Sequence, residues 1–504
     1  MPADSRYPVA RSDDGRSFVI ADAVGSSFVA GSLVVVHADG TRQLALVEER
    51  TLTTPVRLRG RLIGELAVDG IDTGVSHAFD SGRVEPVDSG IVQTLHETTG
   101  AVLDIGVNLT PPFGPARLLP KKFNRHTFWC GQSGSGKTYA LGVVLEQLIA
   151  HTALPMVIFD PNSDFVRLGE LRDDASGPAA DALRERDIRV LRPHDAAAPL
   201  RARFTEMPLP SKAAVLRIDP IVDREEFGEL LRMAELMTAE LDETLAKLSC
   251  SENPAQRRLA LRIQNLGLNT WEVWARGATA VTDIVARRPD ATVLDLGGFS
   301  TGEQQLVVAL ALLDDLWARR EERCPLLLVI DEAHNLASPH LDSSIAVAVR
   351  ERLVQIAAEG RKFGLWLLLS TQRPTKVHPG ILSQCDNLAL MKMTSPSDLA
   401  ELGTYFGYAP TALLECSPWF RQGEALFAGG FVPTPSLVKM SSPIDLEGLA
   451  TYFGYAPAAL IARSPWFRQG EALFAGGFVP APTLVKMNAR LTPEGGTDVG
   501  VPMR

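Results

Sequence analysis

The sequence predicts an α/β fold with a parallel-rich sheet, an N-terminal small β-barrel, a helical insertion and a duplicated C-terminal segment. Three observations indicate it. Short apolar runs alternate with helical patterns between residues 126 and 372, a glycine-rich loop follows the first of these runs, and a 47-residue unit occurs twice near the end of the chain. Near-continuous apolar strands between helices are typical of a parallel sheet that is covered on both faces.

Composition bounds the class of protein. The 504 residues are enough for several domains with buried cores. A hydrophobic content of 45% and a charged content of 22% are ordinary for a soluble globular protein. The net charge of −10 argues against a generally basic coat for nucleic acid. A basic ring inside a pore would still be compatible with it, because a channel needs only local charge.

Cysteine usage and the N-terminal residues indicate a compartment. The five cysteines are scattered and form no CxxC pair: Cys130, Cys250, Cys324, Cys385 and Cys416. This usage fits a reducing cytoplasm and supports neither zinc nor a disulfide framework. The first residues lack an apolar core segment, so we expect no signal peptide. No apolar run approaches about 18 residues, so we expect no membrane span and a cytoplasmic location.

The N-terminal part is predicted to be a small domain of its own. Residues 1–16 are expected to form a disordered lead-in. Over residues 17–115, short alternating runs such as SLVVVHAD and RQLALVEER are separated by Gly and Asp turns. That spacing predicts a small antiparallel β-barrel. The following stretch, NLTPPFGPARLLP, is expected to be a linker.

The main sheet is predicted in two parts, residues 120–204 and 289–440, with a helical insertion at 205–288 between them. Within the insertion, REEFGELLRMAELMTAELDETLAKL has amphipathic helical spacing. The predicted strands are HTFWCG (126–131), MVIFD (156–160), IRVL (188–191), ATVLDL (291–296), LLLVID (326–331) and LWLLLSTQ (365–372).

The C-terminal part contains an internal repeat. Residues 394–440 recur as residues 441–487, and about three quarters of the positions are identical. A solenoid usually needs at least about three repeats to bury a continuous core. We therefore expect copy one (394–440) to complete the main fold and copy two (441–487) to be an appendage. Residues 488–504 are expected to be a flexible tail.

The stretch GQSGSGKT, residues 131–138, matches GxxxxGK[ST] between a predicted strand and a predicted helix. The backbone N–H groups of such a loop and the helix N-terminus cradle phosphate oxygens. Lys137 would reach the β- and γ-phosphates, and Thr138 would ligate Mg²⁺. A chance match in a glycine-rich loop is the alternative, and the strand-loop-helix context argues against it. The predicted nucleotide-binding residues here are Gly131, Ser133, Gly134, Ser135, Gly136, Lys137, Thr138 and Tyr139.

The apolar run at residues 326–330 is followed by two carboxylates, Asp331 and Glu332. Asp331 is placed to hold the Mg²⁺ shell, and Glu332 to polarise an attacking water. A plain helix cap is the alternative reading. Adjacent Asp and Glu are typical of ATP-hydrolysing motors, whereas the sequence has neither the NKxD motif of GTPases nor an LSGGQ-type signature. Together these motifs predict a RecA-like P-loop ATPase core that uses ATP and Mg²⁺.

The last predicted strand of the parallel set ends in the polar cluster Thr371, Gln372, Arg373. A strand beside the Asp-Glu strand would bring Gln372 close to the γ-phosphate, where it could sense ATP against ADP. An ordinary cap of the strand end is the alternative. Arg373 could bind phosphate or a neighbouring loop, and the sequence leaves that open.

Four motifs in this order resemble the HerA-type ATPases of the HerA/FtsK superfamily: the glycine-rich loop, IDEAHNL (330–336), EGRKFG (359–364) and STQRP (370–374). The resemblance runs from about residue 120 to 440, and the N-terminal barrel matches in kind only. It implies a homo-oligomeric ring, usually a hexamer, with ATP at the subunit interfaces and double-stranded DNA in a central pore. It also implies a partner, either a NurA-like nuclease or a defence effector such as a sirtuin-like NAD hydrolase.

The resemblance assigns further residues. Arg361 in EGRKFG matches the family's arginine finger, and Arg125 is a candidate phosphate or interface residue. A surface salt bridge is the alternative for each. Asp160 in FDPNSDF would have a supporting role at the nucleotide, although Asn162, Ser163 and Phe165 depart from the family pattern.

DNA contacts are only weakly signalled. Basic residues near the motor loops are Lys362, Lys376, His378, Arg350 and Arg352. Non-specific duplex binding needs only a few phosphate contacts per subunit, and solvated helix faces are the alternative. The leading hypothesis is an ATP-driven DNA translocase or helicase that works with a separate nuclease or effector in DNA repair or antiphage defence. The alternative is an ATP-gated scaffold that activates a partner enzyme without processive translocation.

Overall fold

The computed structural model describes residues 7–440 apart from 24, 68–69, 75, 174 and 234–240, together with the strands at 471–474 and 483–486. The chain divides into two compact units. Unit 1 consists of residues 1–152, 171–184 and 386–493. Unit 2 consists of residues 153–170, 185–385 and 494–504. In the described ranges, none of the helices has the length and apolar character of a membrane span.

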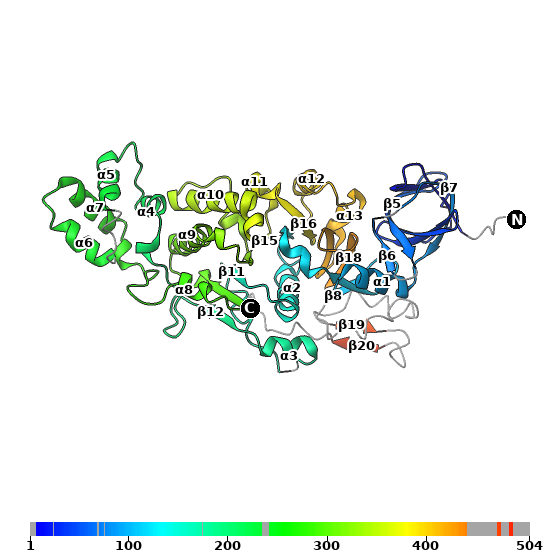
Figure 1. Ribbon diagram of the computed structural model, residues 1–504, viewed down its shortest axis with the longest axis horizontal. Helices are drawn as coiled ribbons and strands as arrows, with labels where there is room; N and C mark the ends of the chain where they lie inside the picture. Colours follow the sequence, from blue (N-terminus) through cyan, green and yellow to red (C-terminus); the bar gives the residue numbers. More distant parts are fainter. Residues whose placement is uncertain are drawn as a thin grey trace, which may run out of the picture. The chain divides into compact units, whose positions relative to one another are not determined.

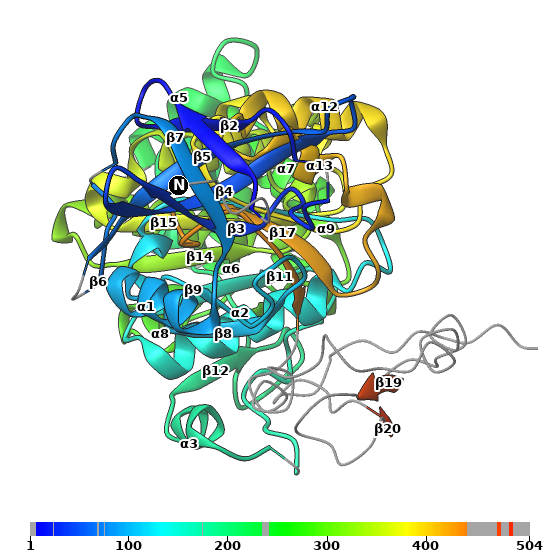
Figure 2. The same ribbon diagram turned by 90° about the vertical axis from the view of Figure 1, so that its right-hand side faces the viewer.

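Unit 1 begins with a closed barrel of six strands in the order β2-β1-β7-β3-β4-β5, and pairing of β2 with β5 closes it. Figure 2 looks onto this barrel. Alternate residues point inward, so that Phe18, Ile20, Val34, Val36 and Val47 fill its interior. The predicted small β-barrel is therefore confirmed. Its strands are β1 (Val9–Ser12), β2 (Ser17–Ile20), β3 (Leu33–Ala38), β4 (Thr41–Thr51), β5 (Arg57–Ala67) and β7 (Phe79–Pro86), and the short β6 (Gly70–Asp72) pairs with β5.

The predicted barrel boundaries are wrong at both ends. Strand β1 lies within residues 1–16, which were predicted to be disordered. It belongs to the barrel, since Ala10 and Ser12 are buried and β1 pairs with both β2 and β7. The barrel ends at Pro86, before helix α1 (Ser89–Thr99). Strands β8 (Leu103–Asn108) and β9 (Pro115–Leu118) form a hairpin that pairs with β18 of a different sheet. Strands β1 and β9 have four residues each, too few to show a clear alternating pattern in the sequence.

The second sheet of unit 1 carries the glycine-rich loop. Its strand order is β10-β16-β17-β18-β8-β9, and the pairs from β16 onward are antiparallel. The loop joins β10 to α2, which is buried along most of its length. These elements are β10 (His126–Cys130), β16 (Cys385–Leu390), β17 (Glu424–Gly429), β18 (Ser436–Met440), α2 (Lys137–His151), α3 (Pro178–Arg184), α12 (Pro396–Tyr405) and α13 (Thr411–Leu414).

Unit 2 contains five of the six strands predicted for the main sheet, in the parallel order β12-β13-β11-β14-β15, and the sixth is β10 of unit 1. Three of the five are buried at every position, as expected for a sheet covered on both faces. Helices α9 and α10 run side by side in Figure 1. The strands are β11 (Met156–Asp160), β12 (Ile188–Leu191), β13 (Ala291–Asp295), β14 (Leu326–Ile330) and β15 (Leu365–Thr371), and the helices are α9 (Gly302–Ala318), α10 (Ser344–Glu359) and α11 (Pro379–Leu382).

The range predicted as a helical insertion holds five helices in the described residues, and α5, α6 and α7 form a separate lobe (Figure 1). The lobe is held partly by charge, because Arg258 of α7 bonds Glu225 and Glu226 of α5. The helices are α4 (Leu209–Val215), α5 (Arg224–Met233), α6 (Leu241–Ser249), α7 (Pro254–Asn265) and α8 (Val281–Ala286).

The two repeat copies differ in how much of them is described. Copy one supplies α12, α13, β17 and β18 to the sheet of unit 1. Of copy two, only β19 (Glu471–Phe474) and β20 (Thr483–Lys486) are described. They pair in the register of copy one, since Glu471 lies opposite Lys486 as Glu424 lies opposite Lys439. The rest of copy two and the predicted tail lie outside the described residues.

Deletion of residues 441–487 is expected to leave the unfolding midpoint and the ATP turnover within about twofold of the full chain. The reason is that copy one already provides the two strands that join β16 to β8. Thermal unfolding and steady-state turnover would check this. The reciprocal variant lacks residues 394–440, so that copy two directly follows residue 393. An unfolded product from the first deletion would refute the prediction that copy two is an appendage.

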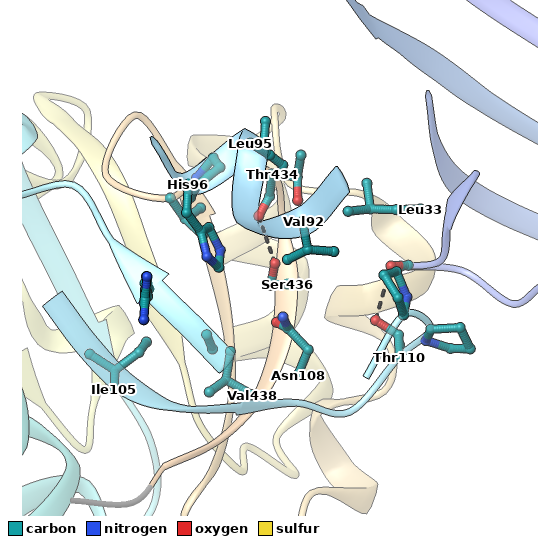
Figure 3. A pocket seen from close by; sticks show the side chains of 17 residues that line it. Leu33, Val92, Leu95, His96, Ile105, Asn108, Thr110, Thr434, Ser436 and Val438 are labelled. Atoms are coloured by element: carbon teal, nitrogen blue, oxygen red, sulfur yellow. Dashed lines mark hydrogen bonds between the residues drawn. The ribbon is translucent and has the colours of Figure 1, made fainter. Parts of the chain in front are cut away.

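A small cavity of about 30 Å³ lies where the barrel meets α1 and β8 in unit 1. Figure 3 shows that Leu33 of the barrel, Val92 and His96 of α1, and Val438 of β18 line it. The space is enough for a water molecule but far too small for a nucleotide. His96 is 6% exposed. Burial, and to a lesser degree the Arg117 charge, lowers the pKa of His96 to about 4.

This burial predicts an acid-sensitive contribution to stability. An unfolded histidine has a pKa of about 6.5, so between pH 6.5 and 4 the unfolded chain binds a proton that the folded chain does not. Stability from His96 is therefore present above pH 6.5 and decreases as the pH falls to 4, by up to about 3 kcal/mol. Denaturant unfolding of His96→Gln should show a flatter pH dependence over that window than wild type. The same substitution at the exposed His194 is the control and should leave the slope unchanged.

Candidate nucleotide site

The glycine-rich loop has the backbone shape that its sequence predicts. Gly134 and Gly136 have positive φ angles of 76° and 87°, a left-handed conformation that glycine adopts at little cost. Lys137 opens α2 and is 6% exposed. The buried Ser135 Oγ has no hydrogen-bond partner in the described part of the chain. Backbone N–H groups in such a loop, together with the positive end of α2, suit a phosphate group.

The C-terminal segment of unit 1 holds this loop from two sides. After β16, Lys392 O accepts a hydrogen bond from Gln132 N (2.9 Å). Before β17, Gly423 N donates to Ser135 O (2.8 Å). A Cβ atom at Gly136 would lie 3.1 Å from Gly423 N, so the loop and the segment pack closely. Copy one of the repeat therefore helps to fix the conformation of the glycine-rich loop, a contact that the sequence did not reveal.

In unit 2, the end of β14 carries the acidic pair. Asp331 is 2% exposed and Glu332 is 5% exposed. Glu332 has a φ of 43°, a left-handed conformation that is uncommon for a residue other than glycine and is often found at functional sites. Gln372, which follows the neighbouring parallel strand β15, donates from Nε2 to Glu332 Oε1 (2.7 Å). The structure thus brings together two of the predicted catalytic residues, Glu332 and Gln372.

A histidine that the sequence reasoning missed joins this cluster. His334 Nδ1 lies 3.2 Å from Glu332 Oε2 and 3.0 Å from Thr371 Oγ1. One oxygen of the Glu332 carboxylate therefore accepts from the Gln372 side chain, and the other accepts from Gln372 N (3.4 Å) and lies near His334 Nδ1. The position of His334, two residues after Glu332, was the available signal. Arg373, whose role the sequence left open, is exposed, and its backbone N donates to Thr371 Oγ1 (3.0 Å).

The Asp160 carboxylate accepts hydrogen bonds from the backbone of the loop that follows it, residues 161–165. One carboxylate oxygen accepts from Asp164 N (2.9 Å) and the other from Phe165 N (2.7 Å). Burial raises the pKa of Asp160 to about 7, these two N–H groups oppose the rise, and the charges of Asp164 and Asp331 add to it. Both oxygens are thus used by loop 161–165. Asp160 therefore positions that loop, and its supporting role at the nucleotide stays a prediction.

The two predicted arginines differ in their surroundings. Arg125 Nε lies 3.6 Å from Asp386 Oδ2, and both side chains are nearly half exposed. This is the surface ion pair that was the alternative reading for Arg125. Arg361 is half-buried in the 3₁₀ turn Gly360–Phe363 between α10 and β15. It lies in the same unit as Glu332, on the segment that leads into β15.

The candidate DNA-binding residues separate into two groups. Lys362 and Lys376 are exposed. Arg352 instead bonds the buried Asp314 (2.8 Å), and Arg350 donates to Pro339 O (3.0 Å). His378 Nδ1 accepts from Gly380 N (3.1 Å) and caps α11. Arg350, Arg352 and His378 thus make contacts within the fold, and a DNA contact by any of the five residues stays a prediction.

Each unit by itself has an oxygen donor that suits a magnesium ion arriving with a nucleotide. Mg²⁺ usually takes one or two protein oxygens together with waters and substrate phosphates. Over the described ranges, no group of three His, Cys, Asp or Glu side chains forms a complete protein cage for a metal. Thr138 at the start of α2 and Asp331 after β14 provide oxygen donors of the kind that Mg²⁺ prefers.

Comparison with known proteins finds a family match for the part of the chain that contains the glycine-rich loop. Residues 114–316 match the family model described as Helicase HerA, central domain. A probable helicase of Methanocaldococcus jannaschii is 34% identical over 113 residues, which are 22% of this chain and 21% of that protein. The DNA double-strand break repair helicase HerA of Sulfurisphaera tokodaii is 31% identical over 153 residues, 29% of this chain and 30% of that protein. The match thus spans less than a third of either relative's length.

Among solved structures, VirB4 of Thermoanaerobacter pseudethanolicus aligns with a TM-score of 0.46 and 15% identity, over 69% of this chain and 98% of that one. The family match includes the glycine-rich loop and the strands β10 to β13. Residues 114–316 thus match a HerA-type central domain, and over this part the chain is similar to the HerA-type ATPases of the HerA/FtsK superfamily.

Proposed function

We propose that this protein is an ATP-hydrolysing motor that moves along or unwinds double-stranded DNA. The observation that carries the proposal is the Glu332 carboxylate, which is buried and accepts a hydrogen bond from Gln372 Nε2 (2.7 Å). The same chain has a glycine-rich loop whose backbone conformation suits a phosphate group. The loop would bind the triphosphate, and the carboxylate would act on water. The relatives described as helicases support DNA as the polymer on which the motor acts.

In the proposed reaction, Lys137 binds the β- and γ-phosphates and lowers their negative charge. Thr138 and Asp331 would hold Mg²⁺, which supplies further charge neutralisation. Glu332 orients a water and accepts its proton while the water oxygen bonds to the γ-phosphorus. The bond between that phosphorus and the β–γ bridging oxygen breaks, ADP leaves, and the proton passes to solvent.

Gln372 is proposed to sense the γ-phosphate by exchanging its hydrogen bond. In the described structure its amide is committed to Glu332. A γ-phosphate oxygen would compete for the same Nε2 donor and so change how Glu332 is held. The loop that follows, Pro374 to Gly380, would pass that change to the DNA-binding side or to a neighbouring subunit.

The assembly is proposed to be a ring, with six subunits as the expected number, and Arg361 would act across the subunit boundary. Lys362 and Lys376, which are exposed, are proposed to contact DNA phosphates in the pore. Strand cleavage would belong to a partner, either a NurA-like nuclease or a defence effector.

The test is ATP turnover with and without linear duplex DNA over a series of salt concentrations. We expect DNA to stimulate turnover, and the stimulation to decrease with salt because phosphate contacts release counterions. ATP turnover that is the same with and without DNA at every salt concentration would instead support the ATP-gated scaffold. In that case the Glu332→Gln variant should still activate the partner enzyme.

Gln372→Ala is expected to lower kcat by about 10- to 100-fold and to change the KM for ATP by less than threefold. The amide orients Glu332, and any hydrogen bond that it makes to the γ-phosphate replaces the one that it already makes to Glu332, so the loss should fall mainly on the chemical step. Steady-state kinetics separate the two parameters. Gln384→Ala is a control in the same unit. A rise in KM with an unchanged kcat would contradict the role of Gln372 in positioning Glu332.

A further inference from the structure

Trp419 is an exposed aromatic side chain that the proposed reaction does not use. It ends the 3₁₀ turn Ser417–Trp419 of unit 1 and is 84% exposed, more than any other large hydrophobic residue in the described ranges. Exposing a side chain of this size to water is unfavourable by roughly 25 cal/mol for each Å² of apolar surface. Tryptophan is enriched on surfaces that bind another molecule, because it combines a large apolar ring with a polar N–H group.

The chain on the N-terminal side of Trp419 is tied to the end of β16. Ser417 is fully buried, and its Oγ donates to Met391 O (2.7 Å) and accepts from Met393 N (2.9 Å). The residue between those two, Lys392, accepts the hydrogen bond from Gln132 N of the glycine-rich loop. Ser417 is therefore bonded to both neighbours of Lys392, the residue that bonds the glycine-rich loop.

The chain on the C-terminal side of Trp419 is tied to the loop directly. Gly423 N donates to Ser135 O (2.8 Å), and Met440 N of β18 donates to Gly423 O (2.8 Å). Lys439 adds a third tie, because its Nζ donates to Gln422 O. Burial lowers the pKa of Lys439, as expected for an ammonium group in the packed hairpin.

These two anchors limit where Trp419 can lie. It is two residues from Ser417 and four from Gly423, so its Cα is within about 7 Å of the first and about 14 Å of the second. Phe420, the next residue, is 5% exposed and points into the protein. Trp419 therefore projects into solvent, and its Cα lies within about 14 Å of Gly423, which bonds the glycine-rich loop. A nucleotide whose phosphates lie in that loop extends its ribose and base outward from it.

We propose that Trp419 stacks on the base of the nucleotide whose phosphates bind the glycine-rich loop of the same chain. The proposal rests on the proposed nucleotide binding and adds a base-binding residue to it. An indole face attracts a nucleobase through stacking, and stacking tolerates any base because each has a π face. The site should therefore lose affinity for ATP and GTP alike when Trp419 is removed.

The sequence provides a matched control for this proposal. SPWFRQG occurs at residues 417–423 and again at 464–470, so Trp466 has the same neighbours in sequence as Trp419. Copy one is the copy whose Gly423 bonds the glycine-rich loop. Trp466→Ala in the full chain should therefore leave nucleotide affinity unchanged.

The experiment compares ATP with inorganic tripolyphosphate, which has the phosphates but no base, by calorimetric titration of the full chain. In Trp419→Ala, ATP and GTP should bind about tenfold more weakly, which corresponds to about 1.4 kcal/mol. Tripolyphosphate should bind within twofold of wild type, and Trp419→Phe should recover most of the ATP affinity. The unfolding midpoint of each variant without nucleotide confirms that it is folded.

Other outcomes would overturn the assignment. Unchanged ATP affinity in Trp419→Ala would refute the assignment of Trp419 as the base-stacking residue. If the mass of the assembly also decreased, a neighbouring copy of the chain would be what covers the tryptophan. An equal loss for ATP and tripolyphosphate would mean that Trp419 only supports the loop. A wild-type chain that binds neither ligand would instead refute the proposed nucleotide site, so the two failures are distinguishable.

Discussion

Replacing Lys137 with alanine is expected to weaken ATP binding by at least about 100-fold, equivalent to about 2.7 kcal/mol. The ammonium group of Lys137 lies at the N-terminus of α2, where it would form charge-assisted hydrogen bonds to phosphate oxygens. Truncation of one partner of such a buried charged pair typically costs about 2–5 kcal/mol. Calorimetric titration with a slowly hydrolysed ATP analogue measures the affinity directly.

Two observations separate a lost phosphate contact from a damaged fold. Lys121→Ala removes an exposed lysine of the same unit and should bind ATP like wild type. The unfolding midpoint of Lys137→Ala without nucleotide should stay close to wild type, because alanine is compatible with the first turn of a helix. Unchanged ATP affinity in a folded Lys137→Ala chain would sink the assignment of residues 131–138 as the phosphate-binding loop.

The parts of the site that the sequence revealed are those encoded by short-range patterns. The glycine-rich loop needs left-handed glycines at Gly134 and Gly136, and such a requirement is visible as residue type and spacing. The strands before Asp331 and Gln372 are continuous apolar runs, so their place in a parallel sheet could be predicted. The order of two neighbouring strands then sufficed to bring Gln372 to Glu332.

The parts that the sequence did not reveal depend on distant contacts or on unusual backbone geometry. The hydrogen bond from Gly423 to Ser135 joins segments that no periodic pattern links. The left-handed φ of Glu332 is a conformation that few residues other than glycine adopt, so residue type gives no hint of it. Strand β1 was missed because four residues are too few to establish an alternation, although closure of the barrel depends on them.

Glu332→Gln is expected to retain ATP binding and to reduce turnover by about 10²- to 10⁴-fold, the usual contribution of a general base. Glutamine has nearly the same shape, and its side-chain oxygen can still accept the hydrogen bond from Gln372 Nε2. The amide cannot take a proton from water, so the loss should appear in kcat. Glu321→Gln, at an exposed glutamate of the same unit, is the matched control. Turnover within threefold of wild type would show that another group activates the water.

The same variant tests whether Arg361 acts across a subunit boundary. Arg361→Ala alone should be nearly inactive yet bind ATP, because a finger stabilises charge that develops in the transition state. In an equal mixture with Glu332→Gln, a heterologous ring would form about a quarter of its interfaces from an intact Glu332 and an intact Arg361. Turnover should therefore recover to a measurable fraction of wild type. Arg257→Ala, an exposed arginine of the same unit, should behave as wild type throughout. If the mixture stays as inactive as its components although mass measurement shows mixed rings, Arg361 serves the site of its own chain.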